Sequence, residues 1–345
     1  MPSTKKSSIS FQFAQDIVRA WNLPNMTSQK DVFEYLGKNT DSGTMSFYRK
    51  QAEEITGIEL LPHNNKFNQM TRLERQNLPP LTNHVKVQSE PYTMVVFSDA
   101  HFEGYETPSY LILLEVLKDL TKTKELKAVV ANGDMLDLSI LSTFAKYTLE
   151  VEPKLRTVQQ EIYDSQEQLS KIQRIIDKAE RKHHMVIHQI ATYGNHELRL
   201  SKYVSRMGIA FEDFQGFTMH NIFPDWQWAM SHFVDDTVMI KHNMRGGIHS
   251  TYQNAYRAGV NIITGHTHQL NARTWVNYNS TNLAVATGHL SEPYHSYQIH
   301  NVANDWHNGF AVVKIDPKEK TIHPELVYVN NHFRTAYFRG KKYKV

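Results

Sequence analysis

Cysteine is absent from the 345-residue sequence. This absence excludes disulfides, thiol nucleophiles and cysteine-ligated zinc or iron–sulfur sites. Any metal ion must therefore be bound by His, Asp, Glu or Asn, a donor set that suits divalent manganese, iron, zinc or nickel. The 19 His residues supply many candidates for such a site.

Long apolar runs are also absent. Nowhere do about 18 consecutive apolar residues occur, and the first residues lack the apolar stretch of a signal peptide. We therefore expect a cytoplasmic protein without a membrane partner.

A strong excess of one charge is missing as well. The chain has 38 Lys and Arg against 35 Asp and Glu, which leaves a net charge of +3. This balance does not support nucleic-acid binding over the whole surface, although it is compatible with a local basic patch. With 40% apolar and 21% charged residues, the composition is that of a folded globular protein.

The domain organisation follows from the length and from changes of pattern, which together suggest about two domains. Three short helical patterns come first and predict a small, helix-turn-helix-like unit. A polar, proline-containing stretch without a sustained period follows and indicates a linker. The expected parts are residues 1–60 (helical unit), 61–90 (linker), 91–330 (main domain) and 331–345 (a basic and aromatic tail).

The main domain shows short β-branched runs, each ending in Asp, His, Asn or Gly. Examples are YTMVVFSDAH, LKAVVANGD and VNIITGHTH. Such runs predict an α/β fold, specifically a layered α/β/β/α sandwich with polar loops gathered at one edge of its sheets.

One long helix is expected within residues 150–182. Its apolar positions alternate in steps of three and four, with one polar gap at Ser165. Two interpretations remain open: an amphipathic helix packed on its own sheet, or a coiled coil that forms a homodimer.

Five motifs that each follow a predicted strand carry the candidate chemistry. A single motif of this kind is weak evidence, but the series as a whole indicates a metal site with more ligands than one ion needs. A pair of ions requires a bridging carboxylate, for which Asp134 is well placed. The motifs are Asp99–His101, Gly133–Asp137, Gly194–Glu197, His242 and Gly265–His268.

This series resembles the calcineurin-like metallophosphoesterase superfamily over Tyr92–Val329. The resemblance implies two divalent ions, manganese first, with iron, zinc, nickel or magnesium as alternatives. It also implies that His196 protonates the leaving oxygen or stabilises transition-state charge. The implied metal ligands are Asp99, His101 and His268 for one ion, Asn195, His242 and His266 for the other, and Asp134 as the bridge.

Several neighbouring residues are expected to support the site. His242 is preferred to His249 as the lone His ligand because it ends an apolar run. Asp137 and Glu197 are expected to orient ligands or backbone groups without binding an ion. Two further residues, Arg199 and Arg245, could clamp phosphate oxygens or form ion pairs with Glu197 or Asp137.

The substrate expectation depends on a departure from one branch of the superfamily. Ser/Thr phosphatases have Arg-Gly after the second motif, where this chain has Leu138-Ser139, and they lack the closing G-H-x-H. The sequence is therefore more similar to phosphodiesterases, repair nucleases and phage-encoded phosphoesterases. We expect attack of a metal-bound hydroxide on a phosphodiester, in nucleic acid or a nucleotide. The alternatives are a phosphomonoesterase or phosphoprotein phosphatase, and a DNA-binding regulatory protein with an inactive phosphoesterase domain.

Two terminal segments bear on nucleic-acid binding. Arg49 and Lys50 lie early in the third helical pattern, where a recognition helix would contact DNA. Residues 331–345 interleave aromatic with basic side chains, a combination suited to bases and phosphates. The alternatives are a docking or dimerisation module and a solvated terminus.

Overall fold

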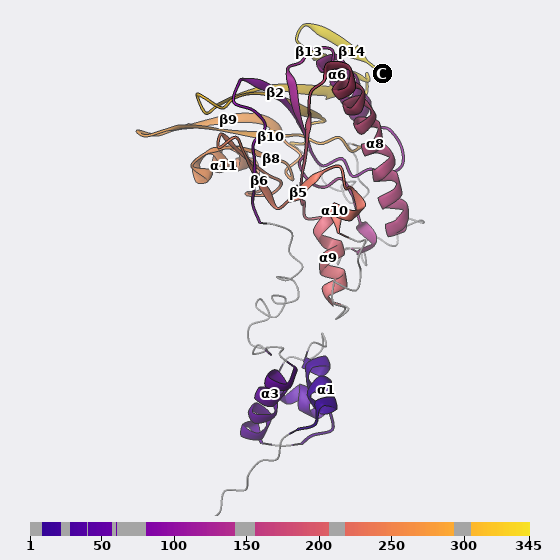
Figure 1. The fold of residues 1–345 in the computed structure, drawn as a ribbon, viewed down its shortest axis with the longest axis vertical. Helices are drawn as coiled ribbons and strands as arrows, with labels where there is room; N and C mark the ends of the chain where they lie inside the picture. Colours follow the sequence, from indigo (N-terminus) through magenta and orange to yellow (C-terminus); the bar gives the residue numbers. More distant parts are fainter. Residues whose placement is uncertain are drawn as a thin grey trace, which may run out of the picture. The chain divides into compact units, whose positions relative to one another are not determined.

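The computed structural model describes two compact units, and each is presented by itself. One unit contains three N-terminal helices, and the other contains two β-sheets with their covering helices (Figure 1). The described residues are 9–21, 28–39, 41–56, 60, 81–141, 156–206, 218–292 and 305–345.

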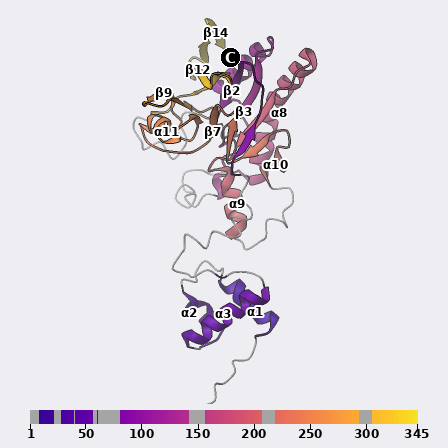
Figure 2. The same ribbon diagram turned by 60° about the vertical axis from the view of Figure 1, so that its left-hand side comes forward.

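The N-terminal unit is formed by α1 (Phe11–Trp21), α2 (Gln29–Tyr35) and α3 (Ser42–Thr56), which pack against one another (Figure 2). The three helices expected in this region are present. Ser28 caps α2 by accepting the backbone N–H of Asp31, whose carboxylate accepts the N–H of Ser28 in return.

The core of this unit gathers around Ile17, Trp21 and Phe33. Arg49 lies 3.7 Å from the Glu53 carboxylate and over the ring of Trp21, so its guanidinium already has partners inside the unit. Whether the helices act as a helix-turn-helix stays a prediction.

Two mixed sheets form the main unit, which confirms the expected α/β sandwich. The β-branched runs form parallel strands, which are Tyr92–Phe97, Leu126–Ala131 and His188–Thr192 in one sheet and Val238–Lys241 and Asn261–Thr264 in the other. The six-stranded sheet has the order β1 (Asn83–Val85), β6 (Ser231–Val234), β7 (Val238–Lys241), β8 (Asn261–Thr264), β10 (Thr281–Thr287) and β9 (Leu270–Val276). The eight-stranded sheet has the order β14 (Lys341–Lys344), β13 (Thr335–Phe338), β12 (Thr321–Asn330), β11 (Gly309–Asp316), β2 (Tyr92–Phe97), β3 (Leu126–Ala131), β4 (His188–Thr192) and β5 (Gln227–Ala229).

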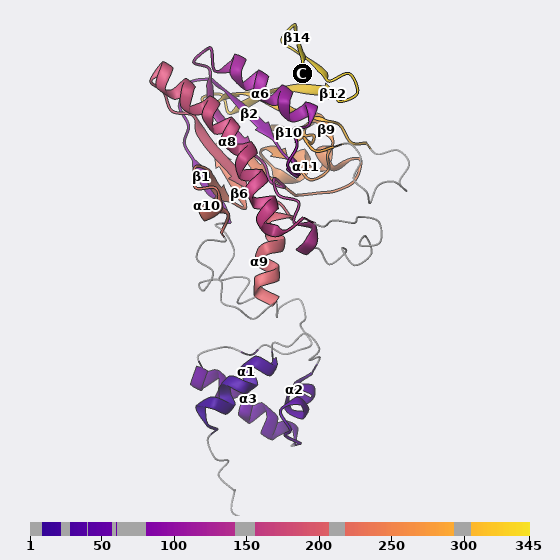
Figure 3. The ribbon, with the colours of Figure 1, turned by 90° about the vertical axis from the view of Figure 1, so that its right-hand side faces the viewer.

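The main core lies between the sheets, where Met94 and Val130 of one meet Ile240 and Val285 of the other. Helices α6 (Pro108–Leu120) and α8 (Val158–His183) lie side by side (Figure 3). Helix α11 (Ser250–Ala258) covers β8, β9 and β10. The remaining short elements are η1 (Ser139–Leu141), α9 (Glu197–Arg206) and α10 (Met219–Ile222).

Helix α8 corresponds to the long helix expected from the heptad pattern. Its seam is buried within this single chain, at Ser165, Leu169, Ile172 and Ile176, so these side chains pack inside their own unit. Leu155, the first position of the expected seam, lies outside the described residues. In the described part of the chain, no helix combines the length and apolar composition needed to cross a bilayer.

Two segments differ in detail from the sequence expectation. The predicted linker contains strand β1, which pairs with β6 and buries Val85 in the core. The predicted basic and aromatic tail forms the hairpin β13–β14 at the edge of a sheet, with Phe338 and Tyr343 buried. Arg339 of this hairpin forms ion pairs with two glutamates, so part of the tail's charge is neutralised within the fold.

Candidate metal centre

The five motifs lie in loops that follow strands of both sheets. Because the strands before these loops run parallel within each sheet, their carboxyl ends meet at one edge. The loops after β2, β3, β4, β7 and β8 carry, in that order, Asp99 with His101, Asp134, Asn195 with His196, His242, and His266 with His268.

The backbone of these loops is unusual. Asp99, His101, Asp134, His266 and His268 all have positive φ values, between 42° and 67°. Side chains other than glycine rarely adopt this region, and such strain concentrates at functional sites.

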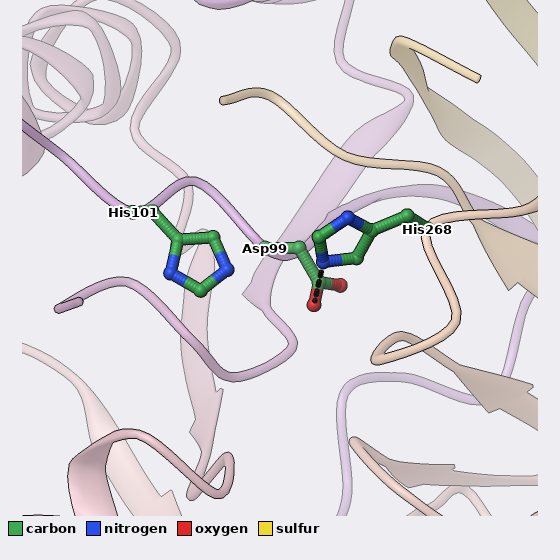
Figure 4. Close-up of side chains that lie close together, drawn as sticks. All are labelled: Asp99, His101 and His268. Atoms are coloured by element: carbon green, nitrogen blue, oxygen red, sulfur yellow. Dashed lines mark ion pairs between the residues drawn. The ribbon is translucent and has the colours of Figure 1, made fainter. Parts of the chain in front are cut away.

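The first cluster consists of Asp99, His101 and His268 (Figure 4). His268 Nε2 lies 3.1 Å from Asp99 Oδ1, and all three side chains are buried. The other carboxylate oxygen, Asp99 Oδ2, accepts the Ser98 hydroxyl at 2.5 Å and the His266 backbone N–H at 2.9 Å. One oxygen is thus anchored to the protein while the other faces the imidazoles.

The second cluster consists of Asp134, His242 and His266. His242 Nδ1 donates to the carbonyl of Asn132 at 2.7 Å, which leaves Nε2 as the nitrogen that faces the site. That nitrogen lies 3.1 Å from Asp134 Oδ2. The hydrogen bond to Asn132 therefore orients the ring toward the carboxylate.

Asp134 lies between the two clusters. It belongs to the second and also groups with His101 of the first and with His196. Asn195 Oδ1 is buried and accepts no hydrogen bond in the described part of the chain, which is costly unless a cation occupies its lone pairs. The oxygen and imidazole donors fit a divalent metal ion.

The pKa values of the cluster reflect its dense charge. Burial alone would raise the pKa of Asp134, but the electrostatic effect of the neighbouring histidines, His242 foremost, lowers it below its usual range. Burial would lower the pKa of His242, but Asp134 and Asp99 raise it to about 10. The carboxylates thus create a site that favours positive charge, whether from protons or metal ions.

Glu197 supports the site through the backbone. Its carboxylate accepts the N–H groups of Asp134 at 2.9 Å, Met135 at 2.7 Å, Leu136 at 3.2 Å and Gly194 at 2.9 Å. A fully buried carboxylate thereby fixes the loops of two motifs at once.

Asp137 lies beside two rings of the site. One of its carboxylate oxygens is 3.3 Å from His101 Nδ1 and 3.1 Å from His196 Nδ1. These contacts hold the two rings in their orientations.

His196 is held on both sides of its ring. Its Nδ1 lies 2.6 Å from the Asp137 carbonyl, and Arg199 Nη2 lies 3.0 Å from its Nε2. Because a guanidinium only donates, Nε2 accepts this hydrogen bond and Nδ1 carries the proton. Arg199 also donates to the Asp137 carbonyl at 2.8 Å, so its described partners are neither of the expected carboxylates.

Two other candidates form no described hydrogen bond or ion pair with the clusters. Arg245 is exposed, without a hydrogen bond or ion pair among the described residues. His249 is exposed at the start of α11 and belongs to none of the described clusters.

The glycines of the motifs allow close approach. A Cβ on Gly194 would lie 2.0 Å from Asp134 Oδ1, and a Cβ on Gly133 would lie 2.5 Å from His242 Nδ1. Only glycine fits at these two positions while the ligand side chains keep their places.

Three neighbours of the site were not expected from the sequence. The His289 ring stacks on His268 at 4.9 Å, and the Trp306 ring lies 3.8 Å from His268. The third neighbour is Asn132, whose carbonyl orients His242. Asn132 directly precedes the second motif, and this position could have identified it from the sequence.

No protein-family model and no curated protein matches the sequence. Solved structures match at low identity. An archaeal phosphodiesterase is 16% identical, with a TM-score of 0.31, over 68% of this chain and 99% of its own. A nuclease from Pseudomonas putida is 12% identical, with a TM-score of 0.27, over 67% and 87%. A protein serine/threonine phosphatase from Saccharomyces cerevisiae is 12% identical, with a TM-score of 0.34, over 92% and 96%. Identities and TM-scores this low do not assign an activity to the chain.

Proposed function

We propose that the chain is a two-metal phosphoesterase that hydrolyses phosphodiesters, in nucleic acid or a nucleotide. The observation that supports this most is the position of Asp134, which groups with imidazoles of both clusters. A carboxylate shared in this way is what a pair of divalent ions requires.

The ligands in this proposal form two half-sites. Asp99, His101 and His268 would hold one ion, Asn195, His242 and His266 would hold the other, and Asp134 would be shared by both. When bound, such ions neutralise phosphate oxygens and lower the pKa of a coordinated water. Manganese is our first choice of metal.

His196 is the proposed catalytic residue. Its Nε2 lies 3.9 Å from Asp134 Oδ2, beside the bridging position. To act as a general acid, Nε2 would give up the hydrogen bond from Arg199, take up a proton from water, and donate that proton to the leaving oxygen.

The two arginines are proposed phosphate-binding residues. Arg199 reaches the site through His196, whereas Arg245 is exposed and unpaired within the described residues. A guanidinium in either place can donate two parallel hydrogen bonds to a phosphate.

A hydrolysis panel with added manganese tests the proposal. It compares bis-p-nitrophenyl phosphate, p-nitrophenyl phosphate, and labelled single- and double-stranded DNA. Turnover of the diester with little turnover of the monoester supports the proposal, whereas the reverse supports a phosphomonoesterase. Tight DNA binding without any turnover supports a regulatory protein with an inactive domain.

Other expectations from the sequence stay predictions. These are the cytoplasmic location, the phage origin, a homodimer through residues 150–182, and DNA binding by the N-terminal unit. The burial of the α8 seam within one chain leaves little of that seam for a second copy.

A further inference from the structure

Residues 237–291 contain no Asp or Glu, although the whole chain has 35 in 345 residues. The same stretch contains Lys241, Arg245, Arg257 and Arg273. It builds β7, α11, β8, β9 and β10, which is most of the six-stranded sheet and the helix that covers it. The part of this layer that residues 237–291 build thus carries positive charge without carboxylates of its own.

Aromatic rings cluster on the outer side of this layer. Tyr252 and Tyr256, one turn apart on α11, contact the Trp275 ring of β9 edge to face, with centroids 5.5 Å and 4.8 Å away. The two tyrosines are 46% and 56% exposed. Large rings exposed together are unusual on a surface without a partner.

Two arginines lie on the same two elements as these rings. Arg273 precedes Trp275 by two residues on β9, so both side chains project from the same face of the sheet. Arg257 follows Tyr256 on α11. Both arginines are exposed, and neither forms an ion pair with any described residue. We call Tyr252, Tyr256, Arg257, Arg273 and Trp275 the α11–β9 face.

This face is connected to the metal centre. A cavity of about 320 Å³ is lined by Gly247 and Ile248, which immediately precede α11, by the proposed ligand His266, and by Gln269 and Trp306. Ser250, the first residue of α11, donates to the Gln269 side chain at 3.2 Å. Helix α11 therefore begins at the wall of the cavity.

We infer that the α11–β9 face binds a single-stranded nucleic acid and leads it to the cavity beside His266. Unpaired basic groups suit backbone phosphates, and exposed rings suit unstacked bases of any sequence. A duplex would not offer its base faces to these rings. The inference rests on the proposed function and names the substrate class of that site.

The test measures binding separately from hydrolysis. Fluorescence anisotropy follows fluorescein-labelled oligo-dT and oligo-U of about 15 nucleotides, a length within the usual span of such sites. The full-length protein is titrated in the presence of a chelator, so no turnover occurs. The two oligomers show whether DNA or RNA is preferred.

Two double variants address rings and charges independently. Tyr252→Leu with Tyr256→Leu should weaken binding roughly tenfold or more at every salt concentration, because base stacking is lost. Arg257→Gln with Arg273→Gln should flatten the log–log salt dependence by about 1.4, that is, about 0.7 for each phosphate contact. If the tyrosine variant fails to fold, the salt dependence of binding by the arginine variant still tests the inference.

Matched controls come from α8, where Tyr163, Lys178 and Lys182 are exposed. Tyr163→Leu, and Lys178→Gln with Lys182→Gln, should leave binding unchanged. All variants should turn over bis-p-nitrophenyl phosphate at the parent rate.

Three results would overturn the inference: no binding by the parent protein, equal losses in the control variants, or a change of oligomeric state in the tyrosine variant, which would make the face an interface between copies. Binding that depends on the face without any diester turnover would support the surface and reject the proposed function.

Discussion

The carboxylate of Glu197 accepts the backbone N–H of Asp134 at 2.9 Å, so the acid of one motif fixes the main chain of another. Glu197→Gln replaces one acceptor oxygen by an amide that faces N–H donors. We expect a loss of unfolding free energy of about 3 kcal/mol, the size associated with a hydrogen bond to a buried charged group. Urea unfolding measures it, with Glu167→Gln on the exposed face of α8 as the control. Equal stability of both variants would contradict the role.

Gly194 provides a steric test of the same loop. Gly194→Ala places a methyl group 2.0 Å from Asp134 Oδ1, so the carboxylate must move. We expect weaker metal binding and a loss of about 1–3 kcal/mol in stability, as for overpacked sites. Gly246→Ala meets nothing within 4 Å and is the control. Isothermal titration calorimetry with manganese compares the metal affinities of the two variants. Equal affinities would contradict the close approach of Gly194 to Asp134.

Glu161 predicts a pH dependence of stability. Its carboxylate accepts the backbone N–H of Leu138, and burial raises its pKa to about 7. In the unfolded chain a Glu ionises near pH about 4.3, so between these values the folded state binds the extra proton. Stability from this group is therefore lost as pH rises through that window, by up to about 1.4 kcal/mol per pH unit.

Glu161→Gln removes this proton. The stability of the variant relative to the parent should rise between about pH 4.3 and pH 7 and then level off. Chemical unfolding at several pH values measures the difference. Parallel curves would mean that Glu161 ionises normally in the folded protein.

His196 and His242 separate catalysis from ligation. His196→Ala should retain the metal content of the parent while turnover falls roughly 10²–10⁴-fold, the usual contribution of a general acid. His242→Ala should lose an ion. Metal analysis and diester kinetics on both variants distinguish loss of a metal ligand from loss of a catalytic residue. Because His196 also groups with His101 and Asp134, loss of metal from His196→Ala would instead make it a ligand.

The sandwich and the composition of its polar edge could be predicted because local pattern and tertiary placement agree. The run before Asp134 is apolar and β-branched, ends in Asn-Gly, and becomes a buried parallel strand whose carboxyl end meets those of its neighbours. Each other motif follows the same rule. A strand that is followed by Asp, His or Asn side chains can therefore be predicted from the sequence without knowing which strands it pairs with.

The hairpin of residues 335–344 was not predicted from the local sequence pattern. Its turn is Arg339-Gly340, with φ values of 49° and 75°, a conformation usually signalled by Asn-Gly or Asp-Gly. The alternation that buries Ala336 and Phe338 was masked by the charges around it. The charged side chains gain partners, such as Glu325, only from the fold.

Contacts between distant residues were equally hidden. Trp306 lies against His268, 38 residues away in the sequence. Glu161 accepts the N–H of Leu138, 23 residues away, and so supports the loop that carries Asp137. No spacing rule links such residues, because the packing of α8 and of the sheets brings them together.

Metal stoichiometry of Asp134→Asn tests the central claim most directly. The asparagine keeps an oxygen that can accept the His196 backbone N–H, now at 2.9 Å, but removes the negative charge shared by the two half-sites. Plasma emission spectroscopy counts ions per chain in the parent, in Asp134→Asn and in Asp236→Asn, an exposed control paired with Lys86. Two ions in the parent and the control, with both lost from Asp134→Asn, is the predicted result. Two ions retained by Asp134→Asn would contradict the bridge.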